Sequence, residues 1–341
     1  FVAIVIENER DEDLDDGLIP QLPAGVLQVL TLADPADPAA GGELSTIDLT
    51  GLAEYAADDP EPEFVDINAR NQAVVSLQEN NHLAIIDLAT GEVVNHFSAG
   101  TADAELVDIA DDGVIELTET LTGIRREPDA VAWIGDDHFA TANEGDYVDA
   151  DGRSGGSRGF TVFDTDGNVV FESGSSFEHA VAAIGHYPEG RSDAKGVEPE
   201  GVEYATFGGR PVLFVGSERA NVVGVYDVSD PAAPELLQLL PTGSGPEGIR
   251  AIPERGIFVV SAENDGFDED PDDQYPVRSL ITVYELGDGP AAYPMIASAA
   301  EASGTPIPWV ALSGLAADAA DAGVVWAVSD SFLAQAWVYR V

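Results

Sequence analysis

Acidic side chains recur at one point of a repeated sequence pattern. A run of apolar, β-prone residues leads into an acidic or amide-rich corner in six segments: 1–10, 72–81, 138–146, 211–221, 256–266 and 324–332. Alignment of the six copies places one carboxylate of each at the same position: Glu7, Glu79, Glu144, Glu218, Glu263 and Asp330. Carboxylates presented toward one axis form a ring that, once desolvated, has to hold cations, pair with arginines or take up protons. Hard oxygen ligands of this kind favour calcium or magnesium.

The same positions allow a purely structural interpretation. An acidic side chain at a sharp turn accepts hydrogen bonds from nearby backbone amides. Both interpretations stay open for Glu144, Glu218 and Glu263, whereas the short loop at Glu79 favours turn capping. If the ring binds metal, the expected ligands are Glu144, Asp146, Glu218, Glu263 and Asp265.

Basic residues are scarce, which limits the sites that could bind an anion. Lys195 is the only lysine, and it lies with Arg191 in the one clustered cationic segment. Arg126 precedes a Glu-Pro pair, and Arg219 follows Glu218 directly. Arginines and lysines interleaved with carboxylates either clamp a phosphate or pair with their neighbours, and pairing is favoured in so acidic a chain. The candidate phosphate ligands are Arg126, Lys195 and Arg219.

Several other kinds of site are disfavoured or excluded. The chain has no cysteine, so disulfides, thiolate metal sites and a cysteine nucleophile are excluded. The five histidines lack HExxH spacing, and no GxSxG, P-loop or GxGxxG motif is present. Two segments, 149–152 and 164–167, begin like calcium loops, but neither has a glutamate at the twelfth position. The second is expected to be a hairpin turn.

The elements that would position these residues are strands. Four copies of the pattern have a proline with an acidic neighbour upstream of the corner, at 62, 128, 199 and 246. A second strand follows each of the main corners, as in 83–88, 160–165, 222–228 and 281–286. A four-stranded antiparallel unit that recurs in this way is typical of a β-propeller, because each blade covers its neighbour's apolar face. We therefore predict an all-β fold, a β-propeller of which about six blades are visible.

The ends of the chain are expected to be incomplete. The first copy begins directly on its second strand, and the last has no fourth strand. Residues 1–341 are thus predicted to form a single β-propeller domain truncated at both ends. Three acidic, loop-like insertions (9–17, 146–156 and 264–276) follow the corners, which places them on one rim of the ring, where propellers usually bind ligands.

The overall charge constrains partners and environment. Lys and Arg number 14 against 63 Asp and Glu, giving a formal net charge of −49. Nucleic acid binding is excluded, because it needs clustered basic side chains. A halophilic or marine surface is the simplest source of most of the carboxylates, since salt screens their repulsion. The longest apolar runs have the length of strands, so no membrane-spanning segment is expected in this window.

The chain also resembles a known family. The strings IENERDEDLDDGLIPQLPAGVLQVL, ATANEGD, VEPEGVEY, FVGSERANVVGVYDVSDP, GPEGI and VSDSFLAQAWVYRV are similar to secreted bacterial β-propellers of the choice-of-anchor I family. Members are often labelled alkaline-phosphatase-like or are joined to an esterase-like phytase domain. The resemblance implies an extracellular, periplasmic or cell-surface propeller, with seven blades in the parent protein. It brings no catalytic constellation that can be transferred residue by residue.

Two functional hypotheses follow. In the first, rim carboxylates hold calcium or magnesium in a secreted phosphoester hydrolase, phosphatase-like or phytase-like, that acts on a phosphorylated small molecule. In the second, the propeller is a non-catalytic surface module that binds a partner or polysaccharide, and calcium only orders the acidic loops. The acidic surface fits the second at least as well, because phosphate is repelled unless a metal inverts the local field.

Overall fold

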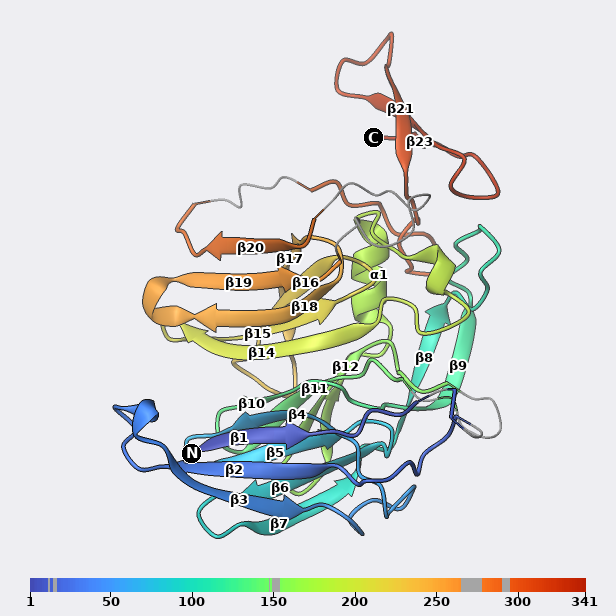
Figure 1. The fold of residues 1–341 in the computed structure, drawn as a ribbon. Helices are drawn as coiled ribbons and strands as arrows, with labels where there is room; N and C mark the ends of the chain where they lie inside the picture. The colour runs from blue at the N-terminus through green and yellow to red at the C-terminus, as the bar shows by residue number, and fades with distance from the viewer. Residues whose placement is uncertain (12, 15–16, 147, 149–153, 265–277, 290–294) are drawn as a thin grey trace.

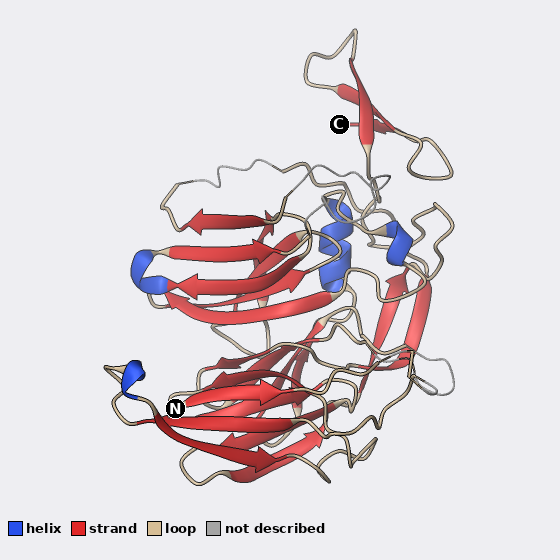
Figure 2. Cartoon of the chain, viewed as in Figure 1, coloured by secondary structure: helices blue, strands red, loops and turns tan. Residues whose placement is uncertain are grey.

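Antiparallel strands form almost all of the regular structure. The computed structural model describes every residue except 12, 15–16, 147, 149–153, 265–277 and 290–294. Figure 2 shows strands throughout, with only short helices in the connections. The helices among the described residues are α1 (Ser176–Ala183) and the 3₁₀ turns η1 (Pro38–Ala40), η2 (Glu189–Arg191) and η3 (Pro253–Arg255).

Three sheets of the described chain have four strands in simple up-and-down order. The first contains β4 (Pro62–Ile67), β5 (Gln72–Leu77), β6 (His82–Asp87) and β7 (Glu92–Ser98). The second contains β10 (Val131–Ile134), β11 (His138–Ala142), β12 (Phe160–Asp164) and β13 (Val169–Glu172). The third contains β14 (Pro199–Phe207), β15 (Arg210–Ser217), β16 (Val222–Asp227) and β17 (Glu235–Pro241).

Three further sheets have three strands in the described part of the chain, and a hairpin stands between two sheets. The first of these sheets contains β1 (Val2–Ile6), β2 (Val26–Leu32) and β3 (Gly42–Asp48). The others contain β18 (Pro246–Ile252), β19 (Ile257–Ala262) and β20 (Leu280–Glu285), then β21 (Leu312–Ala317), β22 (Val325–Ser329) and β23 (Val338–Arg340). The hairpin pairs β8 (Thr101–Val107) with β9 (Glu119–Arg125).

Strand composition follows from position within a sheet. The central strands β5, β6, β15 and β16 are buried almost throughout, because neighbouring sheets cover both of their faces. The outer strand β7 instead alternates exposed and half-buried residues, as expected when one face meets solvent. Phe214 of β15 stacks on Phe258 of β19 with ring centroids 4.0 Å apart, joining two adjacent sheets.

The sheets that begin with β1, β4, β10, β14 and β18 are arranged around an axis lined by these first strands. β4, β10, β14 and β18 contact one another in succession, and β1 lies against β4 (Figure 1). The sheet β21–β23 projects beyond the others at the C-terminal end. The loops beside it anchor it, since the indole nitrogen of Trp309 donates to the carbonyl of Ala183 at 2.9 Å and Leu333 is buried. The chain is therefore a β-propeller, and the predicted fold class is confirmed.

Most sequence-predicted elements occur where expected. Each of the six aligned copies supplies a strand to one of the six sheets. The turn at Asp164 is the predicted hairpin turn, in which its carboxylate accepts the amides of Asp166 and Asn168. The sequence Val-Ile-Glu-Leu at 114–117 would suit a strand, but the segment is irregular and buries Ile115 and Leu117. The single-domain assignment and the blade number of a parent protein stay predictions.

Candidate functional site

The same backbone contact recurs at the corner of four sheets. The residue before each repeated proline accepts an amide from the corner that follows the second strand, as in Glu218 to Glu198 at 3.1 Å and Glu263 to Gly245 at 2.8 Å. Equivalent bonds run from Gly145 to Glu127 and from Gln78 to Glu61. In each of these four sheets the bond therefore holds the segment before the first strand against the corner after the second strand.

Two of the pre-proline glutamates adopt a conformation that usually favours glycine. Glu127 has φ 42° and Glu198 has φ 46°, while the equivalent Gly245 has φ 66°. A left-handed backbone costs a residue with a side chain about 1–3 kcal/mol, and such residues cluster at functional sites. Glu127 and Glu198 adopt this backbone conformation despite its cost.

Three carboxylates converge at the centre of the rim. Glu144, Glu198 and Glu218 each offer an oxygen, and these oxygens all lie within 4.8 Å of one another. Glu144 follows β11, Glu198 precedes β14 and Glu218 follows β15, so two blades contribute. We call Glu144, Glu198 and Glu218 the axial cluster. Sequence reasoning selected Glu144 and Glu218 but missed Glu198, although three of the four repeated motifs carry a glutamate before the proline.

Basic side chains neutralise the axial cluster. Lys195 Nζ lies 2.6 Å from Glu144 Oε1 and 3.7 Å from Glu198 Oε2. Arg219 contacts Glu198 Oε2 at 3.1 Å through Nε and Glu218 Oε1 at 2.7 Å through Nη1. The Nε of Arg191 lies 2.6 Å from the fully buried Glu198. The predicted phosphate ligands Lys195 and Arg219 are thus brought together with two of the predicted metal ligands.

Burial and mutual repulsion set the charge states at the rim. Burial raises the pKa of Glu218 to about 7, although Arg219 opposes the shift. Burial and the neighbouring Glu218 raise the pKa of Glu200 to about 9. Burial lowers the pKa of Lys195, but the adjacent carboxylate of Glu144 outweighs it and the net shift is upward. Lys195 therefore stays protonated, while Glu218 and Glu200 bind a proton more readily than a free glutamate does.

Other corner acids repel one another across the rim. Burial and the nearby Glu63 raise the pKa of Glu7 to about 8. Burial raises the pKa of Glu79 to about 8, with Glu7 adding to the effect. The negative charge of Glu263 also contributes to raising the pKa values of Glu218 and Glu247. Several of the predicted corner carboxylates therefore repel one another, whereas a complete ring that includes Asp330 stays a prediction.

The remaining predicted ligands have different surroundings. Asp146 pairs with Arg10 at 3.1 Å. Asp265 lies outside the described residues. Asp330 accepts the amide of Ser331 at 2.7 Å, as the turn-cap interpretation expects. Turn capping does not account for Oε2 of Glu79, because this oxygen has no hydrogen-bond partner in the described chain.

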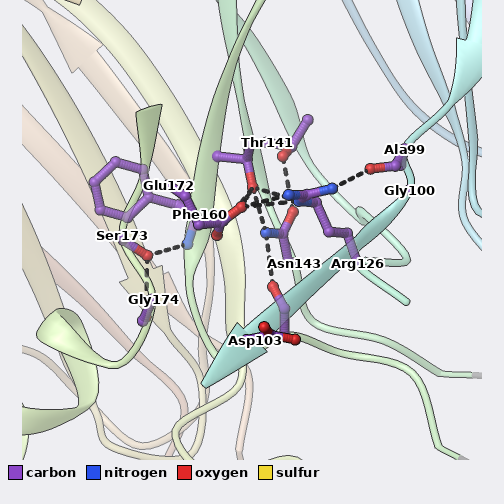
Figure 3. Close-up of polar contacts among 12 residues, drawn as sticks. Ala99, Gly100, Asp103, Arg126, Thr141, Asn143, Phe160, Glu172, Ser173 and Gly174 are labelled. Carbon is purple, nitrogen blue, oxygen red and sulfur yellow. Dashed lines mark hydrogen bonds and ion pairs between the residues drawn. The ribbon is translucent and has the colours of Figure 1, made fainter. Parts of the chain in front are cut away.

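Arg126 is not brought to the axial cluster. Its Nε and Nη2 donate to Glu172 Oε2 at 2.9 and 2.7 Å, and Nη1 donates to the carbonyl of Ala99 at 2.6 Å. Figure 3 shows the guanidinium between these two partners, with Thr141 and Asn143 beside it. The side chain is buried and lies over the ring of Phe163. Arg126 directly follows β9, and its bonds to Glu172 link β9 to the sheet β10–β13. The guanidinium does not face a ligand.

A family comparison identifies the chain. A model of the choice-of-anchor I domain matches residues 40–155 and 152–231, which together cover more than half of the chain. The chain belongs to the choice-of-anchor I family. Its description suggests a cell-surface or secreted protein. No helix of the described chain is both long and apolar enough to cross a membrane. No curated protein matches this choice-of-anchor I chain.

Solved structures share parts of the fold at low identity. The hydrazine synthase of Kuenenia stuttgartiensis is 14% identical, with a TM-score of 0.42, over 79% of this chain and 55% of its own. The virginiamycin B lyase of Staphylococcus aureus is 9% identical, with a TM-score of 0.43, over 89% and 69%. A Bacteroides fragilis protein described as a 6-phosphogluconolactonase is 13% identical, with a TM-score of 0.41, over 88% and 70%. The activities of these proteins do not carry over.

Proposed function

We propose that this choice-of-anchor I propeller is an extracellular or periplasmic, metal-dependent phosphoester hydrolase that works at the axial cluster. The observation that carries the proposal is the meeting of Glu144, Glu198 and Glu218 with Lys195 and Arg219 in one place. Clustered carboxylates with adjacent basic side chains are what a metal-assisted phosphate site requires.

The donor set fits a hard divalent cation. All three donors are carboxylate oxygens, and their separation of at most 4.8 Å allows two of them to bind one calcium ion at about 2.3–2.6 Å each. A bound cation would polarise a phosphoryl oxygen and lower the pKa of a bound water. Calcium or magnesium would take the place of the Lys195 ammonium beside Glu144, which would free Lys195 to contact the phosphate.

Arg219 is placed to orient the substrate. Its Nε and one terminal nitrogen are held by Glu198 and Glu218, and the side chain is 40% exposed. A guanidinium fixed in this way can present its remaining N–H groups to a phosphate. Asp146 and Glu263, at neighbouring corners, extend the negative field that attracts the cation.

Turnover of p-nitrophenyl phosphate and phytate tests the proposal. The purified protein should hydrolyse them in high salt with calcium or magnesium and lose activity after chelation. Glu218→Gln should lower kcat/KM by at least about 100-fold, since it removes a charge at the reacting centre. Arg250→Gln, which changes an exposed arginine paired with Glu203, is the matched control and should retain activity. No turnover by the wild type under any of these conditions would contradict the proposal.

One observation favours a non-catalytic use of the same rim. Three carboxylates face three cations, Arg191, Lys195 and Arg219, so the axial cluster is already charge-balanced. A balanced cluster can serve as a rigid surface for a partner or polysaccharide, with calcium ordering only the loops. Calcium that raises the melting temperature, together with an absence of turnover, would support this second function.

A further inference from the structure

The C-terminal sheet has the same corner as the other blades. The amide of Asp330, at the corner after β22, donates to the carbonyl of Ala311, just before β21, at 2.8 Å. Ala311 also has a positive φ of 50°, as Glu127 and Glu198 do at the equivalent place. The sheet β21–β23 is therefore in register with the other sheets, and its two faces can be assigned from theirs.

Position in the repeat decides which neighbour each face meets. Val74 and Phe214 stand at the same distance before the corner amides of Gln78 and Glu218, and both pack against the sheet that follows in the chain. Residues on either side of this position point the other way and pack against the preceding sheet. Val259 is the equivalent residue of β19, so its face should meet a following sheet.

That face of the sheet β18–β20 is uncovered. Strand pairing places Ile281 beside Ser261 and Val283 beside Val259, so these side chains share one face. Ile281 is 73% exposed and Val283 is 58% exposed. The opposite face is packed, since Phe258 lies in one core cluster with strands of the sheet β14–β17. Adjacent aliphatic side chains left in water mark an interaction surface.

The sheet β21–β23 carries the complementary face. By the same register, the neighbours of Trp326 in β22 should point toward a preceding sheet. Strand pairing extends this face to Leu315, Ala317, Val325, Ala327, Tyr339 and Val341. None of these residues is charged, although the chain contains 63 Asp and Glu, and Leu315 is 75% exposed. The two faces therefore match in chemistry and in their place in the repeat.

Contacts on both sides hold the C-terminal sheet away from the matching face of its own chain (Figure 1). Before β21, the indole nitrogen of Trp309 donates to the last residue of α1 at 2.9 Å, and Val310 is buried in the largest core cluster. Between β22 and β23, Leu333 is buried in the same cluster, and the amide of Ala334 donates to the carbonyl of Gly113 at 2.7 Å. Pairing the two faces within one chain would break these contacts.

We propose that two copies of this chain associate through these faces, with β21–β23 of each copy packed on β18–β20 of the other. The same contact is made twice, so the assembly is closed and isologous. Repulsion between two chains that each carry a formal charge of −49 opposes association, and salt screens that repulsion. The dimer should therefore form at high ionic strength.

Sedimentation equilibrium in concentrated potassium chloride tests the proposal. The wild type should be a dimer. Ile281→Asp and Leu315→Asp should each raise the dissociation constant at least about 100-fold, because each removes a buried aliphatic side chain from two contacts. Leu44→Asp on β3 is the matched control: Leu44 is 55% exposed but lies on neither face, so this variant should stay dimeric. A monomeric wild type, or a dimer that both face variants leave intact, would overturn the proposal.

Cross-linking distinguishes two copies from one. The chain has no cysteine, so Ile281→Cys and Leu315→Cys can be combined in one variant and joined by a short bis-maleimide. The product should contain two chains on a denaturing gel. Links confined to single chains, or no link at all, would overturn the proposal.

Mixing the face variants provides an independent readout. An equimolar mixture of Ile281→Asp and Leu315→Asp should recover part of the dimer, because one of the two contacts is then formed by unsubstituted faces. A mixture no more dimeric than either variant alone would contradict the reciprocal arrangement.

Discussion

Glu198 makes more charged contacts than any other residue described at the rim. Its side chain is fully buried and forms ion pairs with Arg191, Lys195 and Arg219, and its backbone has a left-handed conformation. A strained backbone conformation persists where the surrounding contacts stabilise it. At the scale of one residue, Glu198 therefore orients all three cations of the axial cluster.

Removing the charge of Glu198 should loosen this arrangement. Glu198→Gln is expected to lower the free energy of unfolding by about 1–2 kcal/mol, a modest loss because Arg191 and Arg219 are partly exposed and can be rehydrated. Urea unfolding followed by circular dichroism measures the change. Arg250→Gln, whose side chain is 74% exposed, should alter it by less than about 0.5 kcal/mol.

Glu178 predicts a specific pH dependence. Burial raises its pKa to about 7 in spite of the neighbouring Arg158. The folded state therefore binds a proton more tightly than the unfolded state, so this group stabilises the fold most below pH 4.5 and loses that contribution as pH rises through 7. The stability of wild type minus Glu178→Gln should fall from pH 5 to pH 8. A flat difference would contradict this assignment.

The repeat register selected corner residues that the structure brings close together, while their roles as ligands stay predictions. Glu144 and Glu218 lie together, with Lys195 and Arg219 beside them. Arg126 does not join them, because it forms an ion pair with Glu172, which is distant from it in the sequence. No local pattern encodes that partner, since the two strands become neighbours only after the sheets pack.

At the scale of elements, two backbone segments that cross at Gly145 and Gly156 position Glu144. A Cβ on Gly156 would lie 2.1 Å from the carbonyl oxygen of Glu144, and one on Gly145 would lie 2.1 Å from the amide of Gly156. Such distances are far below van der Waals contact, so only glycine fits both strands of the crossing. The loop after β11 and the segment before β12 thus fix the axial cluster from one side.

A glycine substitution should expose this constraint. Gly156→Ala is expected to destabilise the protein by more than about 2 kcal/mol, because the added methyl group meets backbone that cannot move aside. Gly135→Ala is the matched control, since Gly135 also has a positive φ (70°) but open space around its Cβ. It should cost only about 1 kcal/mol. Equal losses in the two variants would mean that the crossing is not tight.

At the scale of the whole molecule, negative charge dominates. Its formal net charge of −49 favours solubility but opposes compaction. Salt shortens the screening length from about 10 Å at 0.1 M to about 3 Å at 1 M. The melting temperature should therefore rise by several degrees over this range. Choline chloride at equal ionic strength should reproduce most of the rise, and no rise in either salt would contradict the screening account.

The ring arrangement of the blades was predictable because repeats impose one register on every copy. The strand alternation gave one strand to each of six sheets, and the Pro-acidic motif marks the first strand of four of them; the sheet β21–β23 projects beyond the others. The burial of Asp59 and Glu61 was not predictable in the same way. Asp59 and Glu61 fall just before a repeated strand, in a segment whose burial depends on the neighbouring sheet.

Anomalous scattering from crystals grown with manganese tests the central claim most directly. The account predicts a peak among Glu144, Glu198 and Glu218, with the ammonium of Lys195 moved away from Glu144. Ordered carboxylates still paired with Lys195, Arg191 and Arg219, without a peak among them, would contradict a metal-dependent site at the axis.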